Sequence, residues 1–233
     1  MGPIGMDPQA YSDIVGFLEE LTGIALGDQK MALVESRLRD PMRRMGIDDP
    51  REYLRRVRAD TAGADAARFV NALTTNPTGF FREPEHFEFL DQHVEKLFAA
   101  GRRTFRMWSA ACSTGEEAYS MAMVLKDVVG DSPVDAKILA SDINSDCLEY
   151  ARAGWYYADE IRGILPAMPT RFFGKTRRTE FGTELMINED LKEFCVFKRL
   201  NLRNLPYRMK GPFDVIFLRN VMIYFTPELR RRI

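Results

Sequence analysis

The residues best suited to chemistry lie in two short segments that each follow an apolar, strand-like stretch. The first segment, Ser109–Glu117, reads SAACSTGEE and follows the strand-like residues 105–108. The second is Asp142, which ends the stretch 137–142. Open α/β sheets bind ligands beyond the carboxyl ends of their strands. Small residues let a backbone pass close to a ligand, and Gly115 adds conformational freedom. Together these segments predict a nucleotide-type binding site.

The composition of the first segment limits the ligand. It lacks the G-x-G-x-x-G pattern, which disfavours a dinucleotide with a pyrophosphate. S-adenosylmethionine carries a ribose but no phosphate, so its site does not need that density of glycine. Asp142 lies one helix and a loop beyond Gly115, where a carboxylate can accept hydrogen bonds from both ribose hydroxyls.

Both acidic residues also have a structural interpretation. Asp142 begins the run DINS, which is rich in helix-capping residues, and can cap the next helix instead. Thr114 and Glu117 have the spacing of a capping box. The pattern alone divides Asp142 evenly between the two roles and favours the cap for Glu117.

Two patterns divide the chain into the elements that must position these residues. Residues 1–95 carry apolar side chains at helical spacing and predict a helical N-terminal domain. From residue 96 the strand-like segments 105–110, 137–142, 194–200 and 213–218 alternate with helices, which predicts a parallel sheet. The fold class is therefore α/β, with a Rossmann-like domain at 96–233. Residues 155–193 break the alternation and predict a small inserted antiparallel β-subdomain.

Composition excludes several classes of function. The chain has 233 residues and a net charge of −1, which argues against general attraction to nucleic acid. Its longest apolar runs are too short to insert into a bilayer. The N-terminus lacks the features of a signal peptide, and Cys112, Cys147 and Cys195 lack CxxC spacing, so we expect reduced thiols in the cytoplasm. His86 and His93 fit helix packing or surface, and no metal site is expected.

Four segments carry a more specific resemblance: Thr74–Glu83, Trp108–Ser120, Ala140–Ile143 and Phe213–Phe225. In order and spacing they resemble the CheR family of chemotaxis protein-glutamate O-methyltransferases, and the resemblance covers nearly the whole chain. It implies a helical N-terminal domain, an S-adenosylmethionine-dependent methyltransferase domain and an inserted β-subdomain. Because the family fold continues through further strands, the resemblance also implies that C-terminal strands are missing here.

The resemblance carries a set of site residues over to this sequence. The implied cofactor contacts come from the linker and the four strand ends and are Asn76, Thr78, Arg82, Glu117, Asp142, Asn201, Leu202, Leu218 and Arg219. Arg82 and Tyr224 are the implied catalytic residues. Arg82 then holds the carboxylate of the substrate or of the cofactor, and Tyr224 stands near the transferred methyl group. Arg219 keeps the alternative role of a structural ion-pair partner.

The implied reaction transfers a methyl group to glutamate side chains of chemotaxis receptors and so tunes sensory adaptation. With a pKa of ~4.3, only about 1 in 500 glutamates is protonated at pH 7, so no general base is required. This agrees with the lack of a histidine near any motif. One alternative is a non-catalytic sensor or scaffold of the same family that binds S-adenosylmethionine. A methyltransferase of small molecules is another.

A basic segment in the helical region predicts where a partner docks. Residues 30–58 contain nine lysines and arginines against five acids. The plain interpretation is a solvated helix face. The sharper one is an electrostatic docking site for the glutamate-rich cytoplasmic helices of a chemotaxis receptor, and the family resemblance supports it.

Overall fold

The N-terminal part of the chain is a bundle of helices. The computed structural model describes residues 5–61, 63–74, 76–162 and 169–233, so Thr75 of the first motif segment lies outside it. The bundle contains α1 (Pro8–Thr22), α2 (Met31–Met45), α3 (Pro50–Ala59) and α4 (Ala64–Leu73). Asp7 and Asp49 cap α1 and α3, each followed by proline at the first helical position. None of the helices in these ranges is long and apolar enough to cross a membrane.

The apolar faces of these helices meet in one core. Ile14 and Leu18 of α1 pack with Val34 and Leu38 of α2 and with Phe69 of α4, and all five are fully buried. Because the apolar residues recur at helical spacing, each helix presents one such face. The predicted helical N-terminal domain is confirmed.

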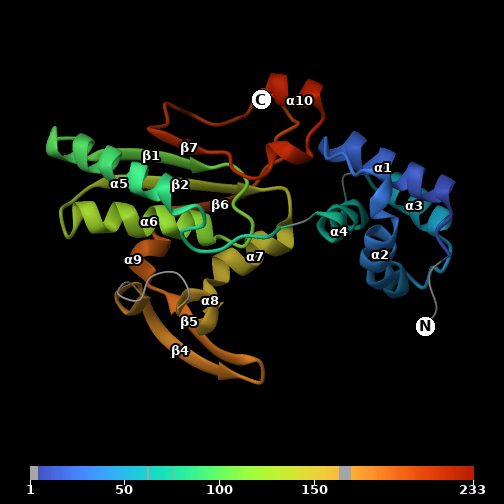
Figure 1. Cartoon of the computed structure of the whole chain (residues 1–233), viewed down its shortest axis with the longest axis horizontal. Helices are drawn as coiled ribbons and strands as arrows, with labels where there is room; N and C mark the ends of the chain where they lie inside the picture. Colours follow the sequence, from blue (N-terminus) through green and yellow to red (C-terminus); the bar gives the residue numbers. More distant parts are fainter. Residues whose placement is uncertain (1–4, 62, 75, 163–168) are drawn as a thin grey trace.

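The second part of the chain contains a parallel sheet in the order β6-β2-β1-β7. Its strands are β1 (Thr104–Ser109), β2 (Asp135–Asp142), β6 (Cys195–Arg199) and β7 (Val215–Phe217). Ser109 is in register with Ala140 on one side and with Phe217 on the other, so these strands end at the same edge. The predicted parallel α/β sheet is confirmed, and its carboxyl edge faces the helical domain (Figure 1).

Two apolar layers enclose the sheet. α5 (Pro84–Ala99) and α6 (Glu116–Val129) pack on one face, where Phe87, Leu90 and Met121 meet Phe105 and Met107 of β1. A second cluster lies under α10 (Pro227–Arg232) and includes Trp108, Leu202, Phe225 and Leu229. The short helix α7 (Ser145–Ala153) follows β2 and is capped by the side chain of Asn144.

The predicted insertion is a three-stranded antiparallel sheet in the order β3-β5-β4. It contains β3 (Trp155–Tyr157), α8 (Ala158–Arg162), β4 (Phe173–Thr179) and β5 (Gly182–Ile187), and α9 (Glu189–Lys192) leads back to the main sheet. It projects below the main sheet in Figure 1, and residues 163–168 of it lie outside the described residues. The division of the chain at residues 95 and 96 stays a prediction, and α5 runs through that position.

Polar contacts join the helical domain to the carboxyl edge of the sheet. The Asn144 amide donates hydrogen bonds to the Asn71 carbonyl and to the Thr74 hydroxyl, at 3.2 and 2.8 Å. The Asn71 amide donates to the Ser145 hydroxyl at 2.8 Å. These contacts hold α4 against the start of α7, close to the end of β2, and so bring the helical domain to the edge where the strands end.

Candidate cofactor and catalytic site

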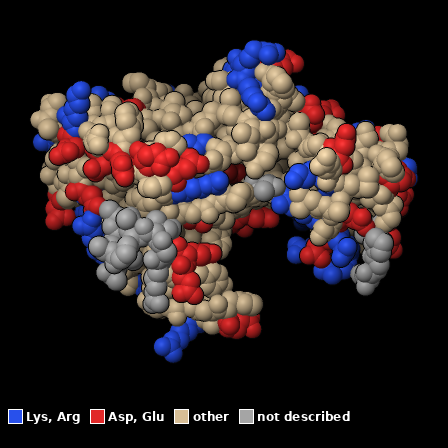
Figure 2. Space-filling model, viewed as in Figure 1, with Lys and Arg blue, Asp and Glu red and all other residues tan. Residues whose placement is uncertain are grey.

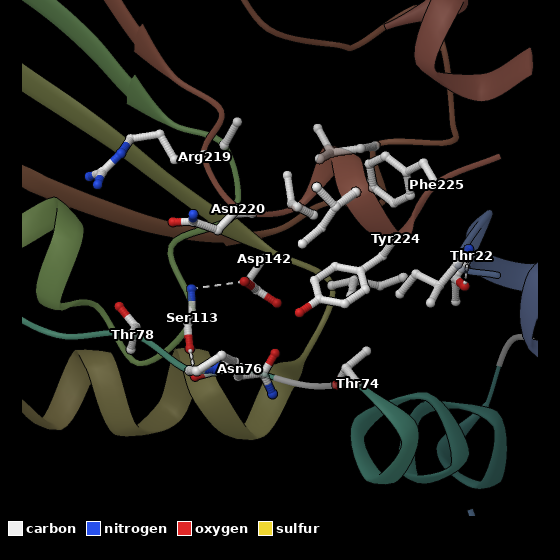
Figure 3. A pocket seen from close by; sticks show the side chains of 18 of the residues that line it. Thr22, Thr74, Asn76, Thr78, Ser113, Asp142, Arg219, Asn220, Tyr224 and Phe225 are labelled. Atoms are coloured by element: carbon white, nitrogen blue, oxygen red, sulfur yellow. Dashed lines mark hydrogen bonds between the residues drawn. The ribbon is translucent and has the colours of Figure 1, made fainter. Parts of the chain in front are cut away.

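A cleft that is open to solvent lies between the helical domain and the carboxyl edge of the sheet (Figure 3). It is lined by the end of α1, by the linker between α4 and α5 (residues 74–83), by the loop after β1 and by the segments that follow β2, β6 and β7. The predicted site residues that line it are Asn76, Thr78, Arg82, Glu117, Asp142, Asn201, Leu202, Arg219 and Tyr224. The sequence-based set therefore converges on one place.

Asp142 is a buried carboxylate at the centre of this edge. Its side chain accepts hydrogen bonds from the backbone N–H groups of Ser113, at 2.8 Å, and Asn144, at 2.9 Å. Burial raises its pKa, and these backbone hydrogen bonds oppose that shift. Because Asn144 and not Asp142 caps α7, the capping alternative for Asp142 is wrong. Each carboxylate oxygen keeps a further lone pair for a ligand.

The loop after β1 follows a path that requires glycine at position 115. The backbone φ of Gly115 is +99°, and a Cβ there would lie 2.7 Å from Cβ of Ala151 and 2.9 Å from the hydroxyl of Tyr156. An alanine would therefore clash with α7 and adopt an unfavourable backbone conformation. Glycine at this position lets the loop pack tightly against α7 and places Ser113 opposite Asp142.

The capping box predicted for Glu117 is absent. Gly115 is the N-cap residue of α6 and makes no side-chain cap hydrogen bond. The Thr114 hydroxyl instead donates to the carboxylate of Glu116, at 2.9 and 2.7 Å from its two oxygens. The interpretation that the pattern alone favoured is therefore wrong. The N-cap position belongs to Gly115, and the Thr114 hydroxyl binds the side chain of Glu116 instead of capping the helix.

Glu117 instead faces the cleft as part of a polar cluster. Oε1 accepts a hydrogen bond from the Ser109 hydroxyl at 2.6 Å, and Oε2 pairs with the Arg219 guanidinium at 3.2 Å. Burial raises the pKa of the Glu117 carboxyl, while the contacts with Ser109 and Arg219 oppose that shift. The cluster places a carboxylate at the cleft wall beside the start of α6.

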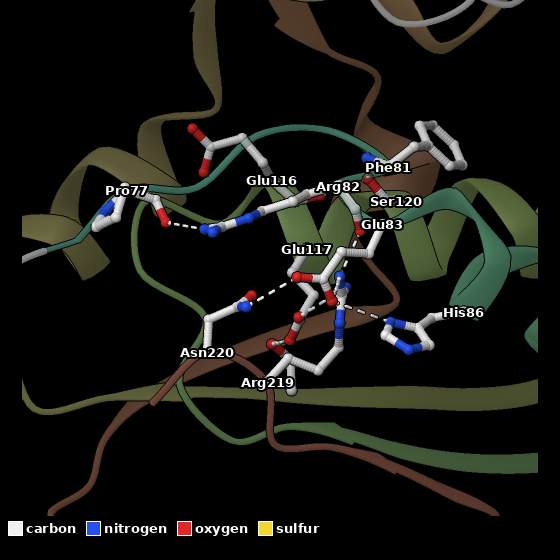
Figure 4. A network of polar contacts seen from close by, with 11 residues as sticks. Pro77, Phe81, Arg82, Glu83, His86, Glu116, Glu117, Ser120, Arg219 and Asn220 are labelled. Carbon is white, nitrogen blue, oxygen red and sulfur yellow. Dashed lines mark hydrogen bonds and ion pairs between the residues drawn. The ribbon is translucent and has the colours of Figure 1, made fainter. Parts of the chain in front are cut away.

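Arg219 links this wall to the linker (Figure 4). Its guanidinium pairs with Glu83 at 3.0 Å and also donates to the carbonyl oxygen of Arg82. Asn220 donates to the other oxygen of Glu83 at 2.8 Å. The hydrogen bonds from Asn220 and Arg219 hold the pKa of Glu83 below its ordinary value. Two adjacent residues of the loop after β7, Arg219 and Asn220, therefore bind Glu83 at the end of the linker.

The surroundings of Arg219 favour its structural role. Its guanidinium lies over the rings of Phe87 and Phe217, 5.4 Å from each centroid. A guanidinium enclosed by two carboxylates and two rings is well suited to joining the elements that supply them. Its Nε is buried without a hydrogen-bond partner among the described residues. Arg219 also borders the cleft, and its contact with the cofactor stays a prediction.

The linker itself crosses the cleft in an unusual conformation. Phe81 and Glu83 have φ values of +51° and +57°, which side-chain-bearing residues seldom adopt. The backbone N–H of Phe81 donates to the Ser120 hydroxyl of α6 at 2.9 Å, and the guanidinium of Arg82 donates to the Pro77 carbonyl at 2.7 Å. These contacts hold the linker against α6 and leave the exposed side chain of Arg82 at the cleft.

Tyr224 faces Asp142 from the opposite wall. Figure 3 shows its ring inside the cleft, with the hydroxyl directed toward the Asp142 side. The residue belongs to the short 3-10 helix η3 (Met222–Tyr224) after β7 and is half-buried. Its hydroxyl has no hydrogen-bond partner in the described part of the chain, so it is available to a ligand.

Two further predicted residues, Asn201 and Leu202, follow β6 and line the cleft. One predicted residue after β7, Leu218, does not line it. The Asn201 amide donates to the carbonyl oxygen of Leu21, at the end of α1, at 2.8 Å. Leu202 is buried and lines the cleft. Leu218, in contrast, packs into the cluster around Trp108, and the cleft lining does not include it.

The structure also adds residues that the sequence did not indicate. The helical domain contributes Thr22, Ile24 and Leu26, which follow or end α1, and the loop after β1 contributes Ser113. Ser113 lies inside the quoted motif, so its place after the strand was a usable signal. Ile24 gave no such signal, because its partner Phe225 lies about 200 residues further along the chain.

The composition of the cleft fits S-adenosylmethionine. Charged groups of both signs, Arg82 and Glu117, line the cleft and match the carboxylate and the amino group of the cofactor's amino-acid end. The apolar side chains of Ile24, Leu202 and Phe225 line another part of the cleft and suit an adenine ring. The buried Asp142 carboxylate lies in the same cleft and can accept hydroxyl donors of a ribose.

The partly buried Glu116 carboxyl, next to Glu117, predicts a measurable pH dependence of stability. Burial raises its pKa from 4.5 to about 7. The raised pKa means that the carboxyl contributes stability fully below 4.5 and that this contribution is lost as the pH rises through about 7. Glu116→Gln, which keeps an acceptor for Thr114, should match the original protein near pH 5 and exceed its free energy of unfolding at pH 8 by about 1–3 kcal/mol.

Urea unfolding of both proteins between pH 5 and 8 measures this difference. Glu149→Gln, at an exposed position of α7, is the control for a charge change alone. A difference that stays constant across this range, or that matches the control, would contradict the buried environment of Glu116.

Comparisons with known proteins agree with this geometry. A family model described as "CheR methyltransferase, SAM binding domain" matches residues 76–233, and "CheR methyltransferase, all-alpha domain" matches residues 9–74. The chain is 40% identical to the chemotaxis protein methyltransferase of Salmonella typhimurium over 92% of its own length and 73% of that protein. The corresponding protein of Escherichia coli is 40% identical over 96% of this chain and 76% of its own length. The chain therefore belongs to the CheR methyltransferase family, whose cofactor is S-adenosylmethionine.

Proposed function

We propose that this chain transfers the methyl group of S-adenosylmethionine to glutamate side chains of chemotaxis receptors and forms glutamate methyl esters. The names of its relatives, chemotaxis protein methyltransferase, support the receptor as substrate. The observation that carries the proposal is the shared cleft, in which the Tyr224 hydroxyl and the Asp142 carboxylate face each other and whose lining includes the exposed Arg82. Both histidines of the chain lie on α5, and neither lines the cleft.

A carboxylate acceptor suits a cleft of this kind. Near neutral pH a glutamate side chain is already ionised, since the ordinary pKa of its carboxyl is ~4.3. When bound, S-adenosylmethionine supplies a methyl group on a sulfonium, and its displacement by a carboxylate oxygen returns the S–C electron pair to sulfur and leaves a neutral thioether. No proton moves in this step. The task left to the protein is to position the carboxylate and to exclude water, and orientation alone can supply about 7–11 kcal/mol.

Arg82 and Tyr224 are the residues proposed to position that carboxylate. One nitrogen of Arg82 is hydrogen-bonded to the Pro77 carbonyl, which fixes the side chain while leaving further N–H donors. A planar guanidinium suits a carboxylate through two parallel hydrogen bonds. The Tyr224 hydroxyl donates to one carboxylate oxygen and leaves the other free to attack. The proposed cofactor contacts are the predicted residues that line the cleft, namely Asn76, Thr78, Arg82, Glu117, Asp142, Asn201, Leu202 and Arg219.

The role of Asp142 predicts a loss of cofactor affinity on substitution. Asp142→Asn removes the charge that accepts the ribose hydroxyls and sets an NH₂ group against a backbone N–H. We expect the Kd for S-adenosylmethionine to rise by about 10- to 100-fold, since hydrogen bonds to charged groups contribute about 1.5–3 kcal/mol. Isothermal titration calorimetry measures it, with the exposed Asp146→Asn of α7 as control. An unchanged Kd in Asp142→Asn would remove the proposed contact.

The methyl-transfer step predicts a selective loss of rate in Tyr224→Phe. Transfer of labelled methyl to receptor-containing membranes should give a base-labile label, as expected of an ester. Tyr224→Phe should lower kcat on the order of 100-fold, the typical effect of removing a preorganised donor, with little change in cofactor affinity. Tyr157→Phe, in the β-subdomain and outside the cleft lining, is the control.

Two results would oppose this account. A wild-type rate in Tyr224→Phe would remove the catalytic role of its hydroxyl. Tight cofactor binding without any label on receptor protein would instead indicate a sensor or scaffold of the same family.

The basic face of α2 and α3 is the proposed docking site for the receptor. Figure 2 shows lysine and arginine side chains gathered at the lower edge of the helical domain, where α2 lies in Figure 1. Arg39, Arg44 and Arg55 are exposed, and no ion pair involves them among the described residues. Charges of this kind attract an acidic helix chiefly by raising the association rate.

Reversing this charge should weaken the receptor interaction alone. The triple substitution of Arg39, Arg44 and Arg55 by glutamate should lower kcat/KM for the receptor by about tenfold at low salt, with a smaller effect at high salt. The Kd for S-adenosylmethionine should not change. The matched control reverses three exposed charges of the α/β domain, Arg208, Lys210 and Arg231. Equal losses in the two triple variants would contradict docking at this face.

A further inference from the structure

The segment that follows α1 makes direct backbone contact with the segment that carries Tyr224. The N–H of Ala25 donates to the carbonyl oxygen of Tyr224 at 2.8 Å, and Ile24 forms an antiparallel bridge with Phe225. Within its own segment, the backbone N–H of Tyr224 donates to the carbonyl oxygen of Val221 at 3.0 Å. The helical domain therefore supplies the hydrogen bond to the Tyr224 carbonyl.

The conformation of this segment is set by the end of α1. Gly23 ends the helix in a left-handed conformation, with its N–H on the Glu19 carbonyl at 2.7 Å. The Thr22 hydroxyl donates to the Leu18 carbonyl at 2.7 Å and accepts the N–H of Ile24 at 3.0 Å. Since Thr22 is buried, this turn is sheltered from competing water. The turn directs the N–H of Ala25 toward Tyr224.

Close packing presses the same turn against the α/β domain. A Cβ at Gly23 would lie 2.2 Å from Cδ2 of Leu229, which is buried on α10. The Asn201 amide holds the Leu21 carbonyl from the segment after β6. The turn is thus held by α10, by the segment after β6 and by Tyr224 and Phe225 together.

We propose that residues 23–25 form a clamp that positions Tyr224, so that the helical domain takes part in the methyl-transfer step. This inference rests on the role proposed above for the Tyr224 hydroxyl. Because the clamp acts on the backbone of Tyr224 and its neighbour, a shift of the turn moves the phenol within the cleft. Ala25 and Gly23 are then positioning residues, and Tyr224 is the residue that contacts the substrate.

The chain offers a matched pair of glycines to test the clamp. Gly23 and Gly46 both end helices of the helical domain in the left-handed conformation, with φ of +77° and +66°. A Cβ at Gly46 meets nothing within 4 Å, whereas one at Gly23 clashes with Leu229. Gly23→Ala and Gly46→Ala therefore share the backbone strain, and the clash with α10 occurs at Gly23 alone.

We expect Gly23→Ala to lower kcat for receptor methylation by about tenfold relative to Gly46→Ala, since small misplacements of reacting groups have effects of this order. The KM for the receptor should stay unchanged. Ala25→Pro, which deletes the N–H donor and leaves Gly23 in place, should give the same result. Hydrogen exchange of the peptide 221–226 should be faster in both variants than in Gly46→Ala, a measurement that needs no activity.

A double-mutant cycle with Tyr224→Phe separates the clamp from the catalytic proposal. If the clamp acts through the hydroxyl, Gly23→Ala should lower kcat by less than about twofold in the Tyr224→Phe background. The clamp would be overturned if Gly23→Ala and Ala25→Pro showed the same kcat and the same hydrogen-exchange rate as Gly46→Ala. A tenfold loss of kcat when Gly23→Ala is added to Tyr224→Phe would also overturn it. A wild-type rate in Tyr224→Phe alone would overturn the catalytic role of Tyr224, and the clamp with it.

Discussion

One buried carboxylate determines how the site is assembled. Asp142 ends the second strand, and its oxygens accept the backbone N–H groups of Ser113 and Asn144. A carboxylate withdrawn from water requires such donors, so the loop after β1 and the turn into α7 must both approach it. Gly115 makes this approach possible because the loop packs directly against α7. The ligand-binding edge of the sheet therefore depends on satisfying one buried charge.

The cleft is completed by segments that the sheet does not supply. Arg219, in the loop after β7, holds the linker through Glu83 and through the carbonyl oxygen of Arg82. The turn after α1 meets Tyr224 and Phe225 through backbone contacts. Both domains and the linker between them thus contribute to one site, and a change in the packing of the helical domain reaches the cleft directly.

Local patterns in the sequence predicted the strands, the helices and the residues at strand ends, because alternating strands and helices bring the carboxyl ends of strands to one edge. They left Asp142 undecided between a cap and a ligand role and wrongly favoured the cap for Glu117, since the residues that occupy the N-cap positions, Asn144 and Gly115, are equally local. Leu218 packs into the cluster around Trp108, whereas its neighbour Arg219 borders the cleft. The motif does not show which of these adjacent residues faces the cleft. The contacts of Ile24 with Phe225 and of Ala25 with Tyr224 join distant parts of the chain and had no local signal.

The central claim is that the cleft between the two domains binds S-adenosylmethionine with its ribose on Asp142 and its reactive sulfur facing Tyr224. The most direct measurement is a crystal structure of this chain with the product S-adenosylhomocysteine. The account predicts both ribose hydroxyls within hydrogen-bond distance of the Asp142 carboxylate and the thioether sulfur on the side of the Tyr224 hydroxyl. A ribose bound away from Asp142, or a sulfur directed away from Tyr224, would contradict it.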